Sequence, residues 1–183
     1  PAGGKWLTVS VKKSTLGSKI NEIQLSDNVD WRNKNLNQVV ENYKKASYFK
    51  EIMPYVEDIY SFQTEYLSEF NIYGLKVLMD LFGISAETVR SSQIASNGKT
   101  NEFLVNLLVN TGAKQYISGT GAKSYLDENL FVKEGIEVSW QSFEHPEYPP
   151  LHGNFIPFLS SIDLLFNCGI ERSRDILRSL DNY

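Results

Sequence analysis

The most constraining feature of this sequence is a run of short structural signals in the second half of the chain. A strand pattern at residues 115–118 stops at Gly119-Thr120-Gly121, and a helical pattern follows at residues 122–133. Gly135 ends the helix, and residues 136–143 alternate as a second strand. Strand, glycine turn, helix, glycine stop and strand is the order of a βαβ unit with two parallel strands. Ligands of such sheets usually lie beyond the carboxyl ends of the strands, so we expect a site there.

The remaining patterns extend this unit into a larger α/β fold. Residues 88–91 predict a short strand and residues 98–112 a helix, so the chain from 88 to 143 is predicted as a partly parallel sheet flanked by helices. Alternation at residues 6–11 and 20–25 predicts two more strands, paired as a hairpin.

Helical periodicity dominates the rest of the chain. Apolar residues at helical spacing predict an α-rich insertion at about 34–82, whose many aromatic side chains we interpret mainly as core packing. Pro54 interrupts or restarts this pattern, and Gly83 ends it. Two further helices are predicted at residues 155–166 and 170–180.

Composition limits the class of protein. A length of 183 residues and a hydrophobic content of 42% predict one domain spanning 1–183. The net charge of −4 argues against nucleic acid as a partner. Cys168 is the only cysteine, which excludes an intrachain disulfide and a multi-thiolate metal site. Without a membrane-spanning run or a leader pattern, we expect a cytoplasmic protein.

Two glycine-containing turns are candidate binding elements. Gly98-Lys99-Thr100 opens a helix as a P-loop does, but Gln93 stands where that motif needs glycine. Lys99 and Thr100 can hold an anion at the helix start, or Lys99 is merely an exposed side chain. Ser118, Gly119 and Gly121 end the first strand, where the glycines serve either a tight turn or close approach of a ligand.

Two titratable residues are candidate catalytic groups. His145 follows the second predicted strand and is stiffened by nearby prolines, so its imidazole can act as a general base or be an ordinary loop residue. Asp163 lies between Ile162 and Leu164 on an apolar helix, where a carboxylate either accepts structural hydrogen bonds or faces a cavity. The histidines, His145 and His152, are not spaced as metal ligands, and no metal site is predicted.

Several segments in fixed order resemble the WbqC-like family of bacterial proteins. They are KWLTVSVKK, INEIQL, NYKKASYF, YISGTGAKSYLDENLF, GIEVSWQSFEHPEYPP and LSSIDLLFNCG, and together they extend over nearly the whole chain. Members of the family usually carry an additional N-terminal segment that begins with a strand and a Gln-Pro-aromatic stretch. This sequence lacks that segment, so we expect a sheet short of a strand.

The resemblance implies a role in O-antigen or other polysaccharide biosynthesis. One activity proposed for the family is transfer of glycine, or another amino acid, onto an amino sugar. We therefore expect an aminoacyl or acyl transferase that acts on a nucleotide-linked amino sugar. On that hypothesis His145 is the base, Asp163 orients the amine, backbone N–H groups around Gly119 and Gly121 stabilise the oxyanion, and Lys99 with Thr100 holds a phosphate. The acyl donor, any cofactor and the oligomeric state are not predicted.

Two other function classes remain open at this stage. One is a non-catalytic sugar- or nucleotide-binding module of a polysaccharide assembly pathway, since tyrosine and tryptophan suit sugar stacking as well as core packing. The other is a nucleotidyl enzyme that handles phosphate at residues 98–100.

Overall fold

A computed structural model describes residues 3–180 of the chain, which form two compact units. The helical unit contains the described residues up to Ser85 and from His145 onward, and the βαβ unit is Ala86–Glu144. The broad α/β class is confirmed, because helices combine with a parallel pair of strands. This division leaves the single-domain organisation of residues 1–183 a prediction.

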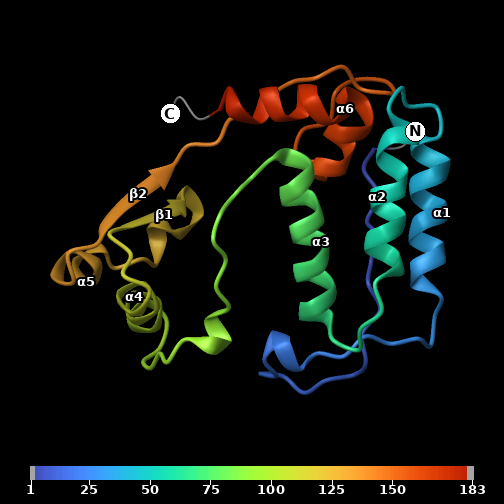
Figure 1. Cartoon of the computed structure of the whole chain (residues 1–183). Coiled ribbons are helices and arrows are strands. Elements are labelled where there is room, and N and C mark those ends of the chain that lie inside the picture. Colours follow the sequence, from blue (N-terminus) through green and yellow to red (C-terminus); the bar gives the residue numbers. More distant parts are fainter. Residues whose placement is uncertain (1–2, 181–183) are drawn as a thin grey trace. The chain divides into compact units, whose positions relative to one another are not determined.

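The helical unit is built on four helices. They are α1 (Trp31–Tyr43), α2 (Phe49–Ser61), α3 (Leu67–Phe82) and α6 (Ser161–Arg178). Figure 1 shows α1, α2 and α3 side by side, with α6 in contact with α2 and α3 at one end. The α-rich stretch predicted at about 34–82 is therefore three helices. Their main core includes the fully buried side chains Ile52, Leu165 and Phe166.

Local signals explain where these helices begin and end. The Asp30 carboxylate accepts a hydrogen bond from the Asn33 backbone N–H at 3.2 Å and so caps α1. Helix α2 continues through Pro54, so the interruption considered from the sequence does not end it. Gly83 closes α3 in the left-handed conformation, at φ 67°, as its position predicted.

The predicted N-terminal hairpin is wrong in its details. Instead of two strands, the structure has single antiparallel bridges, Val11 to Leu25 and Gln24 to Tyr66, and a 3₁₀ turn at Ile20–Glu22. The two segments exchange only two backbone hydrogen bonds, from Lys12 to Gln24 and from Ser26 to Ser10. Earlier in the first segment, the carbonyls of Thr8 and Trp6 accept from the Asn35 and Gln38 side-chain amides of α1, at 3.1 and 3.4 Å, so this part pairs with a helix and not with a strand.

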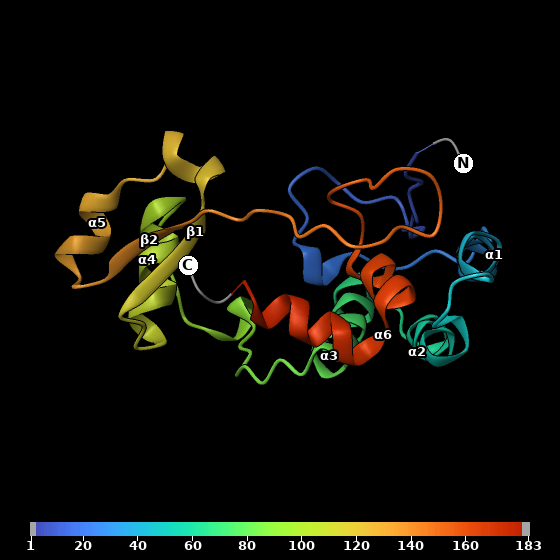
Figure 2. The same cartoon turned by 90° about the horizontal axis from the view of Figure 1, so that it is seen from above.

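The C-terminal helices differ from the prediction at their start. Residues 155–160 are not helical, because α6 begins only at Ser161, and Phe158 in this segment has a positive φ of 60°. The predicted break at Cys168-Gly169 is real, since Gly169 interrupts α6 with φ 74° and ψ 173°. Figure 2 shows the N-terminal segment and the loop before α6 together on one side of the helices.

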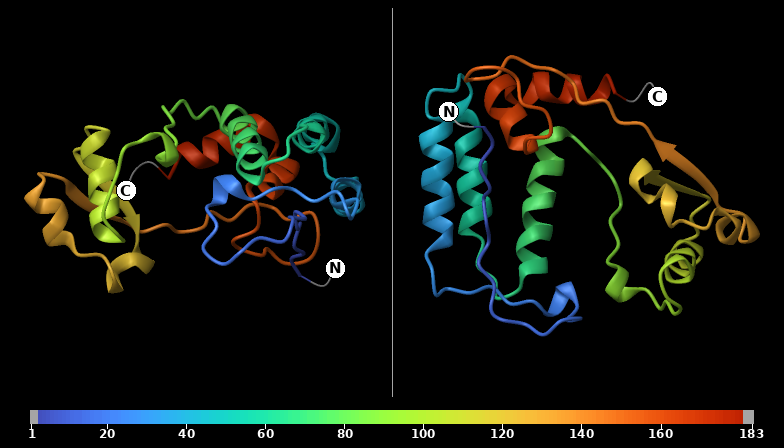
Figure 3. Two further views of the ribbon diagram at one scale, coloured as in Figure 1. Left: turned by 90° about the horizontal axis from the view of Figure 1, so that it is seen from below. Right: turned by 180° about the vertical axis from the view of Figure 1, so that it is seen from behind.

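The βαβ unit confirms the pattern that opened the sequence. Strands β1 (Gln115–Gly119) and β2 (Glu137–Gln141) pair in parallel, with Gln115 opposite Glu137 and Gly119 opposite Gln141. Their connection is a 3₁₀ turn, η3 (Thr120–Ser124), and α5 (Glu128–Lys133), so the predicted single helix from 122 is shorter than expected (Figure 3).

The rest of the βαβ unit is a helix and a small core. Helix α4 (Asn101–Asn110) precedes β1, and Val105, Phe131 and Ile136 are buried between the elements. The strand predicted at residues 88–91 is wrong, because the structure has only a 3₁₀ turn, η2 (Ser91–Gln93), at its end. The sheet of the described residues is therefore two-stranded.

Candidate functional site

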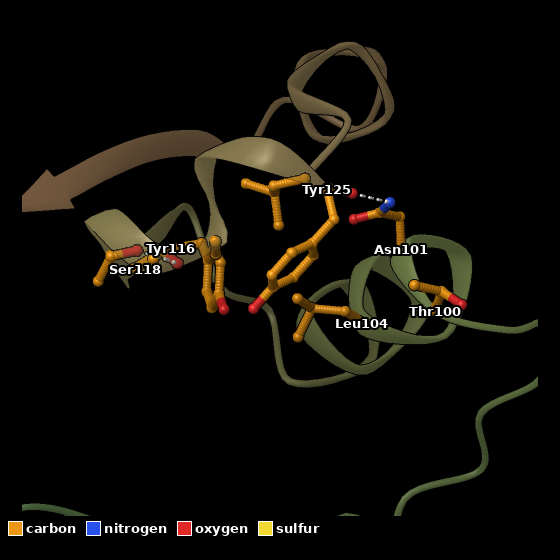
Figure 4. A pocket seen from close by; sticks show the side chains of 10 residues that line it. Thr100, Asn101, Leu104, Tyr116, Ser118 and Tyr125 are labelled. Carbon is orange, nitrogen blue, oxygen red and sulfur yellow. Dashed lines mark hydrogen bonds between the residues drawn. The ribbon is translucent and has the colours of Figure 1, made fainter.

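Four of the five predicted binding residues line one cavity of the βαβ unit. This β1 cavity has a volume of about 420 Å³ and lies where β1 ends and α4 begins (Figure 4). Its lining comprises Thr100, Asn101, Leu104, Tyr116, Ser118, Gly119, Gly121, Ala122, Tyr125 and Leu126. Ser118, Gly119, Gly121 and Thr100 are thus brought together at the carboxyl end of a parallel strand, the edge at which ligands of such sheets bind.

Lys99, the fifth predicted binding residue, is not in the lining of the β1 cavity. At Gly98 a Cβ atom would stand 2.8 Å from the Glu102 Cβ and 3.2 Å from a Glu102 carboxylate oxygen. An acidic side chain therefore already occupies the space over this helix start. The negative charge of Glu102 interacts favourably with the positive N-terminal end of the α4 dipole and repels a second anion.

Asp163 lies in the helical unit as a buried carboxylate held by two tyrosines. The Tyr43 hydroxyl donates to Asp163 Oδ1 at 2.7 Å, and the Tyr148 hydroxyl donates to Oδ2 at 2.8 Å. The side chain is only 8% exposed, and it stands in the first turn of α6, whose N-terminal dipole favours negative charge. Within residues 3–180, no lysine, arginine or histidine forms an ion pair with it.

The raised pKa of each of the two tyrosines keeps its hydroxyl protonated, as a hydrogen-bond donor. Burial raises the pKa of both Tyr43 and Tyr148 well above the ordinary value for a phenol, and the hydrogen bond to Asp163 raises each further. The Tyr43 ring is fixed by stacking on Phe166, with ring centroids 4.5 Å apart. Hydrogen-bond donors that do not ionise thus surround a carboxylate in a rigid setting.

Asp163 lines a second cavity, which lies within the helical unit. This α6 cavity has a volume of about 670 Å³ and lies between the N-terminal segment, α1 and the loop before α6. Its lining includes the side chains of Lys5, Trp6, Gln38, Asn42, Tyr43, His152, Asn154, Phe158 and Asp163. Trp6 is 92% exposed and Phe158 74% exposed, so two aromatic faces border a space that also offers amide groups.

His145 borders the same aromatic cluster. Its ring centroid lies 5.5 Å from that of Phe155 and 5.3 Å from that of Phe158, and both phenylalanines line the α6 cavity. Nδ1 is 2.9 Å from the Pro146 carbonyl oxygen, which can only accept a hydrogen bond. Nδ1 therefore donates to this carbonyl, which fixes the orientation of the ring.

Comparison with known proteins adds the family. The WbqC-like protein family matches residues 1–175. The chain belongs to this family. It is 37% identical over 180 residues to the uncharacterized protein Rv1507c of Mycobacterium tuberculosis, an alignment that covers 96% of this chain and 77% of that protein. No solved structure matches the chain significantly. Membership of the WbqC-like family indicates a role related to polysaccharide biosynthesis.

Sequence reasoning on this WbqC-like chain missed the residues that complete both cavities. Tyr43 was included in an aromatic stripe interpreted as core, and only its contact with a residue 120 positions away gives it a role at the site. Trp6, Phe158, Tyr116 and Tyr125 carry no local pattern that distinguishes them from packing residues. The signal available for Tyr148 was its place in the proline-rich segment beside His145.

The part of the chain that the structure describes has neither a candidate metal site nor a membrane-spanning helix. Residues 3–180 contain no group of three or more histidine, cysteine, aspartate or glutamate side chains suited to a metal ion, and no helix there is long and apolar enough to span a bilayer. Cys168 is buried, and burial raises the pKa of its thiol. The predicted meeting of His145 with the backbone near residue 120 stays a prediction, because the two belong to different units.

Proposed function

We propose that this WbqC-like protein is a transferase that forms an amide on the amino group of a nucleotide-linked amino sugar. The observation that carries the proposal is Asp163, a buried carboxylate that lines a cavity and has no ion-pair partner within residues 3–180. Burying a charge is costly unless it is paired. Each carboxylate oxygen accepts one tyrosine hydroxyl and keeps a further acceptor position, to which a ligand ammonium group can donate.

The walls of the α6 cavity suit a sugar ring. The exposed faces of Trp6 and Phe158 offer the apolar side of a pyranose a stacking surface. Amide side chains of Gln38, Asn42 and Asn154 line the same space, and can bind hydroxyl groups. A cavity of about 670 Å³ is within the usual range of small-molecule sites, roughly 300–1,000 Å³.

The proposed chemistry assigns separate roles to Asp163 and His145. Asp163 binds the sugar as an ammonium ion, and the amine must then lose a proton before it can attack. Nε2 of His145 takes that proton. The amine nitrogen then attacks the carbonyl carbon of an activated aminoacyl or acyl donor, a C–N bond forms, and the bond to the donor's leaving group breaks. The second proton that the nitrogen loses goes to the leaving group.

A second candidate is a non-catalytic sugar-binding module of the same pathway. It is favoured by the same cavity, because aromatic faces, amides and a carboxylate recognise an amino sugar whether or not transfer follows. The two candidates share the ligand and differ only in whether a product forms.

Binding and product formation are tested in turn. Calorimetric titration of amino sugars and their N-acetyl forms is expected to show a preference for the free amine. Asp163→Asn should weaken the binding of the amino sugar by about tenfold to a hundredfold, which corresponds to the loss of a hydrogen bond to a charged group. Asp175→Asn, on an exposed face of the same α6, is the matched control and should leave affinity unchanged.

Mass spectrometry of reactions that contain an amino-sugar nucleotide and acyl thioesters or aminoacyl adenylates then detects amide product. Binding with no product from any activated donor would favour the binding module. Equal binding of amine and N-acetyl sugars would contradict the role of Asp163.

A further inference from the structure

The β1 cavity is uncharged. None of its ten lining residues carries an acidic, basic or imidazole side chain, and five of them are tyrosines or have apolar side chains. Its polar groups are hydroxyls, one amide and backbone, and Lys99 is outside the lining. Such a lining suits a neutral, partly aromatic ligand better than a phosphate group.

Two tyrosine rings are arranged to hold a planar ligand. The Tyr116 ring stacks on Phe131, with centroids 5.4 Å apart and planes 20° apart, and Phe131 is fully buried, so this wall is fixed. Tyr125 is 64% exposed and reaches the cavity from the turn after β1. Figure 4 shows both rings extending toward the same space, beside Leu104. Nucleobases stack on such rings with little dependence on sequence.

Asn101 adds a specific polar contact. Its amide nitrogen donates to the Tyr125 carbonyl at 2.9 Å, which fixes the orientation of the side chain. The amide oxygen is then left as an acceptor, and Figure 4 shows it on the side toward the Tyr125 ring. An acceptor at the edge of a stacking surface is suited to an N–H group of a base.

The two glycines leave room for a second ring next to the stacked one. Gly119 has φ −68°, Gly121 has no positive φ, and a Cβ added at either would meet nothing within 4 Å. Neither backbone geometry nor packing within the described chain requires glycine there. Thr100, also in the lining, is a β-branched residue held at φ 52°, a strain typical of ligand sites.

We propose that the β1 cavity binds a nucleoside group, with the base against Tyr116 and Tyr125 and the ribose over Gly119 and Gly121. The inference takes its ligand class from the proposed function, and it applies to the βαβ unit by itself. It differs from the sequence hypothesis, in which Lys99 and Thr100 bind a phosphate, because Glu102 already occupies that helix start.

The test is a binding study on the whole chain with the five common nucleosides, their monophosphates and inorganic phosphate as probes. Saturation-transfer NMR and calorimetry should find at least one nucleoside whose dissociation constant is within about threefold of that of its monophosphate. Inorganic phosphate should not compete. Tyr125→Ala should weaken the binding of that nucleoside by roughly tenfold or more, whereas Tyr125→Phe should retain the affinity of the wild type.

Matched variants separate this site from the rest of the protein. Tyr55→Ala, at an exposed tyrosine of α2, should bind nucleoside as the wild type does. Asp163→Asn should also leave nucleoside affinity unchanged. Failure of every nucleoside to bind, a requirement for the phosphate, or an unchanged affinity in Tyr125→Ala would each overturn the inference.

The proposed function fails in a different way. Amide formation without nucleoside binding would overturn this inference and leave the transferase intact. Nucleoside binding without amide formation would do the reverse.

Discussion

The pair of tyrosines on Asp163 predicts a stability loss with a distinctive pH dependence. Tyr148→Phe removes the 2.8 Å hydrogen bond to Asp163 Oδ2 and keeps the aromatic ring, whose centroid lies 4.9 Å from that of Phe155. A hydrogen bond to a charged group contributes about 1.5–3 kcal/mol, so we expect the free energy of unfolding to fall by that amount at neutral pH. For a protein of this size, this is a decrease in Tm of roughly 3–12 °C.

The pH dependence follows from the raised pKa of Tyr148 and Tyr43. Between pH 10, where an unfolded tyrosine ionises, and the higher pKa of the folded state, the unfolded chain binds fewer protons than the folded one. Stability is therefore fully present below about pH 10 and decreases as pH rises, by up to about 1.4 kcal/mol per pH unit for each protected tyrosine. Removing Tyr148 removes its share of that decrease.

The assay is urea denaturation followed by far-UV circular dichroism, at about pH 7.5 and at steps above pH 10. The stability difference between wild type and Tyr148→Phe should shrink as pH rises through that range. Tyr43→Phe should behave alike, and the double variant should be non-additive, because both hydroxyls serve one carboxylate. Tyr55→Phe, on the exposed side of α2, should change stability at neutral pH by less than about 0.5 kcal/mol.

The result that would refute this reasoning is a constant difference between wild type and Tyr148→Phe from neutral pH to above pH 10. Burial and the carboxylate would then not hold the phenol proton in the folded state. A loss below about 0.5 kcal/mol at neutral pH would equally show that the hydrogen bonds to Asp163 do not stabilise the fold.

Two further predictions concern glycines. Gly169→Ala should lower stability by at least about 2 kcal/mol in thermal unfolding, because φ 74° with ψ 173° disfavours other residues and the new Cβ would stand 2.5 Å from the Tyr48 ring. Gly112→Ala is the control, since Gly112 has φ 70° but lies in open space, and it should lose clearly less stability. An equal loss in both variants would contradict the clash with Tyr48. Gly119→Ala and Gly121→Ala should fold with unchanged or slightly higher Tm, since neither needs a positive φ, and a marked loss would show a structural role for that glycine.

Local sequence signals were sufficient for the parallel pair of strands and for most of the helices, but not for every element. The glycines after β1 and α5 and the strand patterns between them determined the parallel pair, because turns, helix stops and strand alternation depend on near neighbours. The same holds for α1–α3 and for the break at Gly169. The predicted hairpin near the N-terminus is reduced to the Val11–Leu25 bridge, and the Thr8 and Trp6 carbonyls are bound instead by Asn35 and Gln38, side chains that lie far along the chain.

Tertiary structure alone decided which side chains make a site. Asp163 was a candidate from its place on an apolar helix, but its hydrogen-bond donors Tyr43 and Tyr148 stand 120 and 15 positions away, and no sequence pattern pairs either of them with it. A buried carboxylate must find donors wherever the fold supplies them. Likewise Thr100 and Ser118 share a cavity only because a helix start and a strand end meet in space, which periodicity along one chain cannot encode.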